Sequence, residues 1–249
     1  MLRRPVEVPP VHVYPADEWR IVESRFHEGF HARAETVLAL ANGYVGIRGT
    51  FDEGRPSLSP GTFVNGFHET WPIVHAEDAY GLARTGQTIV NVPDATIIRL
   101  YVDDEPLFVP TARLTHYERA LDMRDGTLSR HLEWTTPAGK HVRVRSCRLV
   151  SLEQRHVAAI SYEVTLLDRD APIAITSEVL NRQDTGQCRS RAPGFDPRQA
   201  TPLTQRVLHA DIAEVDGDRI LLGYRTAASG MTLALGVDHI VEAAQPLQT

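Results

Sequence analysis

Residues 158–166 largely alternate between apolar and polar side chains, and this period of two constrains the fold more than any other feature of the sequence. The apolar positions are Ala158, Ile160, Tyr162, Val164 and Leu166, with Ser161, Glu163 and Thr165 between them. Such alternation buries one face of a β-strand. Residues 127–136 repeat the pattern, but Arg130 falls among the apolar positions and needs a partner if it points inward.

The segment 140–149 changes phase along its length. Val142 and Val144 occupy even positions, whereas Cys147 and Leu149 occupy odd ones. An extra residue in one strand would explain such a slip, so we expect a β-bulge near Ser146.

Turn signals separate the alternating runs. Asp125-Gly126 and Asp216-Gly217 each stand between two such runs, and Pro137-Ala138-Gly139 predicts a third hairpin. The strands expected to flank these turns lie at 114–123, 127–136, 140–149, 206–214 and 219–226. Further strands are expected at 62–69, 96–102, 173–180 and 231–240. More than ten strands joined mostly by short turns predict an all-β fold, a large antiparallel β-sandwich.

Two segments depart from this pattern. Residues 34–40 are the only stretch that predicts a helix, and it is a short one. Residues 184–204 carry two glycines, three prolines and three arginines with no period. A loop of that length is either functional or a disordered surface excursion, and the sequence leaves both interpretations open.

Composition excludes several classes of protein. The 249 residues carry a formal net charge of −6, so the chain lacks the broad basic field that binds nucleic acid. No run approaches the ~20 apolar residues that a transmembrane helix needs, and Met1–Pro5 is not followed by the apolar core of a signal peptide. Only two cysteines, Cys147 and Cys188, are present, and we expect reduced thiols and a cytoplasmic protein.

Polar and aromatic residues gather between Asn65 and Asp94. They are Asn65, His68, Glu69, Trp71, His75, Glu77, Asp78, Tyr80, Gln87 and Asp94. The spacings fit no common metal site, so no metal is expected. Two of the carboxylates could form a glycosidase pair, and the loop could contact a sugar through aromatic faces and polar groups. Ordinary loop residues, satisfied by their own hydrogen bonds, are the fourth interpretation.

Three glycines recur at a spacing of three in residues 42–49 (NGYVGIRG). A glycine-rich stretch can place backbone N–H groups around an anion. No lysine or helix start follows it as a nucleotide loop requires, so tight turns and close packing are the expected use.

The segments together resemble glycoside hydrolase family 65. LALANGYVGIRGTFDEG (38–54) resembles its first motif, and TFVNGFHE (62–69) with EDAYG (77–81) is similar to the next. The likeness continues through VNVPDATIIRLYVDDEPL and YERALDMRDGTLSRHLEWTTPAGKHVRVRSCRLVSLEQRHVAAISYEV to YRTAASGMTLALGVDH (224–239). It spans residues 15–240, and the order and spacing of the motifs carry it.

The resemblance implies one part of a larger architecture. Members of the family, which include maltose, trehalose, kojibiose and nigerose phosphorylases, have an N-terminal super-sandwich of the galactose mutarotase-like type. A linker, a catalytic (α/α)6 barrel and a small C-terminal β-domain follow it. On this basis residues 1–14 are an N-terminal tail and residues 15–249 are the N-terminal domain. The general acid and the phosphate site belong to the barrel, so no residue of this chain is expected to be catalytic.

The implied reaction is inverting phosphorolysis of an α-linked disaccharide, or its hydrolysis, with inorganic phosphate as co-substrate and no other cofactor. The expected partners are the chain's own catalytic barrel, the disaccharide and a second copy in a homodimer. Candidates for the edge of the substrate site are Asn65, His68, Glu69, Trp71 and Tyr80. The alternatives are a free-standing, lectin-like sugar-binding module and a purely structural domain. Calorimetric titration with disaccharides separates the sugar-binding module from the other two.

Overall fold

The computed structural model describes residues 8, 10–75, 77, 79–182 and 206–244. These residues form fifteen strands, one α-helix and one short 3-10 helix, and the strand pairs are antiparallel. The predicted all-β class is therefore confirmed. The chain divides into two compact units, the first made of residues 1–65 and 91–180 and the second of residues 66–90 and 181–249.

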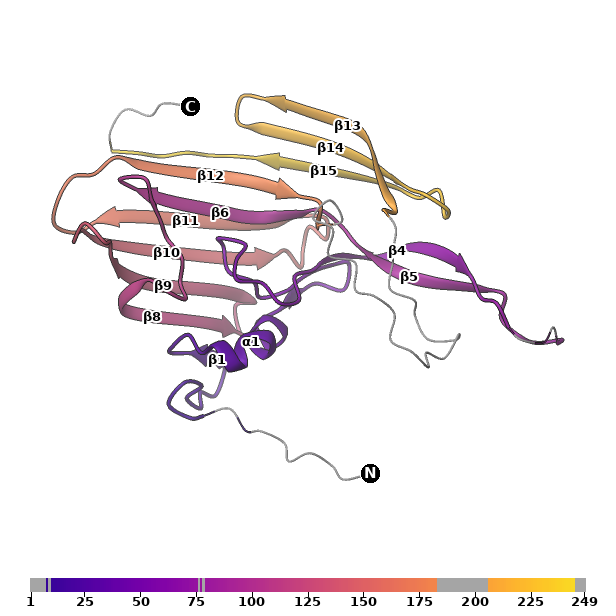
Figure 1. Ribbon diagram of the computed structural model, residues 1–249, viewed down its shortest axis with the longest axis horizontal. Coiled ribbons are helices and arrows are strands. Elements are labelled where there is room, and N and C mark those ends of the chain that lie inside the picture. The colour runs from indigo at the N-terminus through magenta and orange to yellow at the C-terminus, as the bar shows by residue number, and fades with distance from the viewer. Residues whose placement is uncertain (1–7, 9, 76, 78, 183–205, 245–249) are drawn as a thin grey trace. The chain divides into compact units, whose positions relative to one another are not determined.

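A five-stranded sheet of order β1-β8-β9-β10-β11 forms the largest part of the first unit (Figure 1). Its strands are β1 (Arg20–Glu23), β8 (Arg113–Asp122), β9 (Thr127–Thr135), β10 (His141–Val150) and β11 (Ala158–Leu166). A three-stranded sheet has the order β12-β6-β7. Its strands are β12 (Ile173–Leu180), β6 (Asp94–Val102) and β7 (Glu105–Pro106).

The main core of the first unit lies on one face of the five-stranded sheet. Side chains of β8, β9 and β10 meet β6 and the segment that follows it, as a sandwich requires. The buried members are Phe51, Leu100, Val102, Leu107, Val109, Tyr117, Leu132, Trp134, Val142 and Val144.

Helix α1 (His31–Val37), preceded by the 3-10 helix η1 (Glu28–Phe30), covers one end of the same unit. Ala34 and Leu38 pack with Leu40, Leu128 and Val150 in a second apolar cluster. The helix begins and ends about three residues earlier than the predicted 34–40. Leu40 and Ala41 instead form strand β2 (Leu40–Ala41), because they pair with β3 (Val45–Ile47).

Strands β4 (Thr62–Pro72) and β5 (Thr85–Asn91) neighbour each other in the sheet β2-β3-β4-β5. Most of their length forms a ribbon in the second unit. That unit also contains the sheet β13-β14-β15, with strands β13 (Leu208–Asp216), β14 (Arg219–Thr226) and β15 (Thr232–Asp238). The predicted segment 184–204 lies outside the described residues.

The three hairpins expected from turn chemistry are confirmed, but the predicted β-bulge near Ser146 is wrong. Strand β10 pairs with β9 and β11 without a register shift. Its buried positions are Val142, Val144, Ser146, Arg148 and Val150, all of one parity. The apparent phase change arose because Ser146 and Arg148 are polar residues on the inward face.

Candidate functional site

Glu69, one of the predicted site residues, lies on β4 in the second unit and is 3% exposed. Its carboxylate accepts hydrogen bonds from the backbone N–H groups of Ala228 (3.0 Å) and Ser229 (2.7 Å), in the turn between β14 and β15. It also accepts one from the N–H of Thr70 (2.7 Å), and the Ser229 hydroxyl donates to the carbonyl of His68 (2.7 Å). Glu69 thus fixes the β4–β5 ribbon to the β14–β15 turn.

These contacts keep Glu69 ionised. Burial alone would raise the pKa of its carboxyl, but the N–H groups of Ala228, Thr70 and Ser229 outweigh burial and lower the pKa. A general acid needs a raised pKa, so that it keeps its proton until the reaction step. The environment of Glu69 therefore suits a structural role rather than proton donation.

Asn65 and His68 each have a local partner. The side-chain amide of Asn65 donates to the Gly43 carbonyl in the first unit (3.0 Å). In the second unit, Nδ1 of His68 donates to the Gly66 carbonyl (2.9 Å).

Trp71 and Tyr80 differ in how far their side chains are engaged. The Trp71 indole donates to the Thr88 hydroxyl (2.9 Å), and its ring packs where a Cβ on Gly86 would stand, only 2.4 Å from it. Tyr80 is fully exposed, with a relative accessibility of 108%. Of the five predicted residues, Tyr80 therefore has the side chain most accessible to a molecule outside this chain.

A network of buried ion pairs lies beside the apolar core on the inward face of the first unit. Asp52 binds Arg148, Arg130 (2.7 Å) and the Ser146 hydroxyl (2.7 Å). Glu53 forms a two-point pair with Arg130, both bonds being 2.8 Å. The predicted partner of Arg130 is thus supplied by residues more than 70 positions earlier in the chain.

A second pair lies on the neighbouring strands. Glu23 on β1 accepts hydrogen bonds from Arg119 (2.8 Å) and from the Tyr117 hydroxyl (2.7 Å). Arg119 also donates to the Gly49 carbonyl (3.1 Å), and its guanidinium lies over the ring of Phe51, 4.4 Å from the centroid. Three buried arginines are therefore neutralised by three buried carboxylates.

Asp52 and Glu35, like Glu69, are buried carboxylates with lowered pKa values. Burial alone would raise the pKa of Asp52, but the charges of Arg130 and Arg148, with the Ser146 hydrogen bond, lower it to about 2. Burial likewise opposes ionisation of Glu35, but His31 and the N–H groups of Ser59 and Leu58 lower its pKa. These environments stabilise carboxylates and do not favour proton donation.

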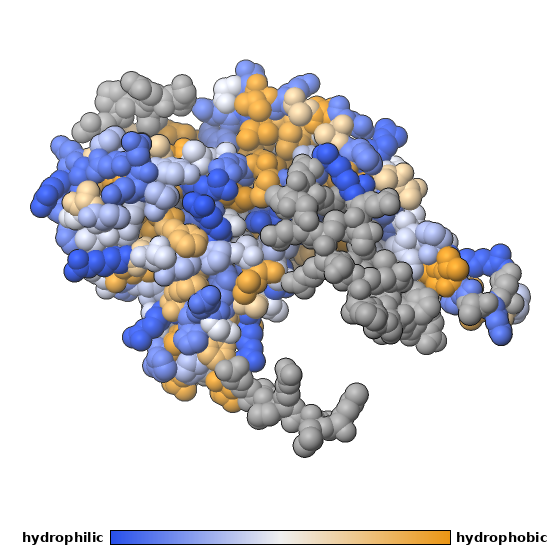
Figure 2. Space-filling model, viewed as in Figure 1, coloured by the Kyte–Doolittle hydropathy of each residue, from blue (hydrophilic) through white to orange (hydrophobic). Residues whose placement is uncertain are grey.

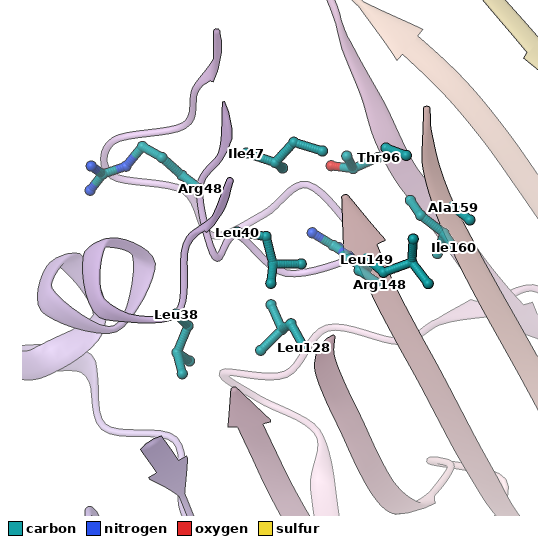
Figure 3. Close-up of a pocket in the computed structure, with 11 residues that line it drawn as sticks. Leu38, Leu40, Ile47, Arg48, Thr96, Leu128, Arg148, Leu149, Ala159 and Ile160 are labelled. Atoms are coloured by element: carbon teal, nitrogen blue, oxygen red, sulfur yellow. The ribbon is translucent and has the colours of Figure 1, made fainter. Parts of the chain in front are cut away.

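An apolar pocket opens among β2, β3, β6, β9, β10 and β11, next to Leu38 at the end of α1 (Figure 3). Its cavity volume is about 10 Å³, which is room for one water molecule at most. Its lining residues are Leu38, Leu40, Ile47, Arg48, Thr96, Leu128, Arg148, Leu149, Ala158, Ala159 and Ile160. A site for a small molecule is larger, about 300–1,000 Å³, and offers convergent polar groups.

The polar residues of this pocket are engaged with other partners. Arg48 points its guanidinium away from the other lining side chains (Figure 3) and donates to Thr36 (2.6 Å). The Thr96 hydroxyl donates to Asp94 (2.7 Å), and Arg148 binds Asp52. The pocket is therefore too small, and offers too few free polar groups, to bind a sugar.

The described residues contain neither a cluster of metal ligands nor a helix that could span a membrane. Residues 8, 10–75, 77, 79–182 and 206–244 include no group of three or more His, Cys, Asp or Glu placed to hold a metal ion. Across the same part of the chain, no helix is long and apolar enough to span a membrane. Asp78, a member of the polar cluster, lies outside the described residues.

Comparison with solved structures defines the class of fold. A structure provisionally named a kojibiose phosphorylase from the human microbiome matches 95% of this chain with a TM-score of 0.73. Sequence identity is 22% and the match covers 29% of that chain, so the likeness concerns the fold alone.

The family follows from sequence. The model of the glycosyl hydrolase family 65 N-terminal domain matches residues 21–249, and the chain belongs to this family. The resemblance found in the motifs is thereby confirmed. An uncharacterized glycosyl hydrolase of Mycobacterium tuberculosis is 40% identical over 229 residues, which is 92% of this chain. The α,α-trehalose phosphorylase of Thermoanaerobacter brockii is 36% identical over 235 residues, or 93% of this chain. The chain spans only 28% and 30% of the lengths of these two relatives.

Proposed function

We propose that residues 15–249 form the N-terminal β-sandwich domain of a longer enzyme that cleaves α-linked disaccharides with inorganic phosphate. One observation carries the proposal: the chain is 36% identical to α,α-trehalose phosphorylase across 93% of its own length, yet corresponds to 30% of that enzyme. The domain would support a catalytic domain elsewhere in the polypeptide, and a homodimer, rather than perform the chemistry.

The environments of the buried carboxylates support the non-catalytic role. Asp52 and Glu53 are bound to arginines, and Glu69 is bound to backbone N–H groups. The pKa of Asp52 is lowered to about 2, whereas a general acid must retain its proton near the working pH. The apolar pocket, with a cavity volume of about 10 Å³, also offers no room and no convergent polar groups for a disaccharide.

In the proposed reaction a carboxylic acid of the catalytic domain donates its proton to the leaving glycosidic oxygen. A phosphate oxygen attacks the anomeric carbon from the opposite face, so the bond to the leaving sugar breaks as the bond to phosphate forms. An α-linked substrate then yields a β-sugar 1-phosphate and a free sugar. Phosphate takes the place of the water and base carboxylate of an inverting hydrolase.

The test is an assay of the full-length enzyme with trehalose, kojibiose and maltose, with and without inorganic phosphate. We expect β-sugar 1-phosphate from one of them, formed only with phosphate, and none from the 249-residue chain alone. Release of two free sugars at a rate independent of phosphate would identify a hydrolase instead. Turnover by the 249-residue chain would overturn the non-catalytic role.

We further propose that Asn65, His68, Glu69, Trp71 and Tyr80 border the substrate site of the full-length enzyme, with the exposed Tyr80 making the contact. Replacing Tyr80 by alanine should raise KM roughly fivefold, because stacking of an aromatic ring contributes about 1 kcal/mol. The melting temperature should not change, since Tyr80 is fully exposed.

Glu69→Gln is the matched comparison, because its carboxylate is bound within the second unit. It should lower the melting temperature and change KM less than Tyr80→Ala does, because Glu69 is 3% exposed. If Tyr80→Ala, Trp71→Ala and His68→Ala all left both KM and kcat unchanged, the substrate-edge role would be excluded.

A further inference from the structure

A small polar cavity in the first unit is bordered by both groups of buried ion pairs. Its volume is about 10 Å³. Its lining includes Arg119, which pairs with Glu23, and Asp52, Arg130 and Arg148, which belong to the other group. The cavity therefore lies where the two groups approach each other, and we call it the arginine cavity.

Each of the three arginines has one nitrogen without a hydrogen-bond partner among the described residues. Arg119 uses Nε and Nη1 for the carboxylate and the carbonyl named above, which leaves Nη2. Arg148 uses Nε and Nη2 for Asp52, which leaves Nη1. Arg130 uses Nη1 and Nη2 for Glu53, which leaves Nε. Three charged side chains that line one cavity thus each retain an unused donor.

The unused donors are shielded from bulk water. Hydrophilic side chains, blue in Figure 2, are spread over the visible surface, where the solvent can accept their hydrogen bonds. Arg119 is only 2% exposed, and Arg130 and Arg148 are each 4% exposed. A buried N–H group without an acceptor destabilises a fold, and the cost is larger when the group is charged. The arginine cavity is therefore a site for an electron-rich acceptor.

Size and charge select the acceptor. A volume of about 10 Å³ is room for about one water molecule and excludes phosphate or a sugar. The three arginines are already balanced by Glu23, Asp52 and Glu53, so the site has no excess positive charge to hold an anion. A water molecule can accept two hydrogen bonds and also donate to a carboxylate of the lining, which a halide ion cannot do.

We propose that the arginine cavity binds one water molecule, which accepts hydrogen bonds from Nη2 of Arg119 and Nη1 of Arg148 and donates to Asp52. The water would join the Glu23–Arg119 pair to the Asp52 network, so that the two groups of ion pairs form one connected system. Asp52 comes from the first family-like motif and the arginines from the long central one, so the water belongs to the contact between motifs. The inference does not depend on the proposed function.

A high-resolution crystal structure of the wild-type protein, from crystals soaked in sodium bromide, tests the proposal without any substitution. We expect one peak in the arginine cavity, within about 3.2 Å of both Arg119 Nη2 and Arg148 Nη1, with no anomalous signal at the bromine edge. An anomalous peak would assign the site to a halide and overturn the proposal. A cavity without density, or a peak that contacts only one of the two arginines, would also overturn it.

The apolar pocket in Figure 3 is the internal control, because its volume is the same, about 10 Å³. Its polar residues are engaged elsewhere, and apolar cavities of this kind stay dry. We expect no ordered water there. Equal density in both cavities would show that volume alone, and not the arginine N–H groups, determines occupancy, and would overturn the assignment.

Thermal unfolding of the wild-type protein in sodium chloride and in sodium acetate of equal ionic strength gives a second measurement in solution. A bound water molecule predicts the same melting temperature in both salts. A halide that binds only the folded state would instead raise the melting temperature with the logarithm of the chloride concentration. Such a chloride-specific rise would overturn the proposal.

Discussion

Replacing Asp52 by alanine should lower the free energy of unfolding by about 3–5 kcal/mol, the usual cost of removing one partner from a buried ion pair. In the interior of the first unit Asp52 forms ion pairs with Arg148 and Arg130 and accepts a hydrogen bond from the Ser146 hydroxyl. Without its carboxylate, Arg148 remains buried and loses its carboxylate partner. Urea denaturation of the wild-type and variant chains measures the difference.

Glu133→Ala is the matched control for Asp52→Ala. Glu133 on β9 pairs with Arg143 on β10 at 2.9 Å, and these two strands also carry Arg130 and Arg148. Unlike the Asp52 network, both side chains of this pair are about one-third exposed. Exposed pairs add little to stability, so this substitution should have a far smaller effect. Equal effects of the two substitutions would show that the buried network does not stabilise the fold.

The pH dependence of the Asp52 contribution has a defined sign. Its folded-state pKa is about 2, below the ordinary value of 3.8. Its stabilising contribution is therefore fully present above pH 3.8 and is lost as the pH falls from there towards 2. The stability curves of the wild type and Asp52→Asn should consequently converge only at the acid end of this range.

Local patterns in the sequence were sufficient to predict most of the strands. Strands β11 and β14 have the predicted bounds, and the Asp-Gly hairpins lie where turn chemistry placed them. Each of these signals needs only neighbouring residues: alternation for one buried face, and glycine for the positive φ of 65° at Gly126 and 55° at Gly217.

The bulge prediction failed for a reason that no local pattern could reveal. Ser146 and Arg148 share the inward face of β10 with valines. Because both are polar, the apolar–polar alternation of the sequence changes phase there although the strand does not. Their partner Asp52 lies 94 and 96 positions away. The one available signal was a polar residue at an inward position, which had correctly marked Arg130 as needing a partner.

The same limit applies to the candidate site. Asn65, His68, Glu69, Trp71 and Tyr80 are close in sequence, but their polar groups have different partners. Glu69 is bound by Ser229, which is 160 positions later. The two family-like motifs 62–69 and 224–239 are therefore joined by this carboxylate, a contact that neither motif indicates by itself.

Several motif residues have contacts that maintain the fold. Asp52 and Glu53 of the first motif bind Arg130 and Arg148 of the long central one. The family likeness of this chain therefore lies in the interactions that build the domain. This explains how the chain can be assigned to an enzyme family although the motif carboxylates Asp52 and Glu69 have lowered pKa values, because ion pairs or backbone N–H groups bind them.

Gly49→Ala is expected to be nearly as disruptive as the loss of Asp52. A Cβ at Gly49 would stand 2.6 Å from the Cβ of Leu38 and 2.7 Å from its carbonyl oxygen. The backbone there cannot move freely, because Gly49 donates to the Glu35 carbonyl (2.9 Å) and accepts from Arg119 (3.1 Å). We expect a loss of about 3 kcal/mol or more, measured by urea denaturation, the upper end of the usual cost of overpacking.

Gly46→Ala, three residues earlier in the same glycine-rich segment, separates close packing from a general intolerance of alanine. A Cβ there would meet only the Cβ of Ala41, at an ordinary 3.8 Å. Stability should be unchanged or raised by up to about 1 kcal/mol, since alanine restricts the unfolded chain. If both substitutions cost the same, the approach of Gly49 to Leu38 would not be the reason for the glycine, and the packing of α1 against this segment would have to be reconsidered.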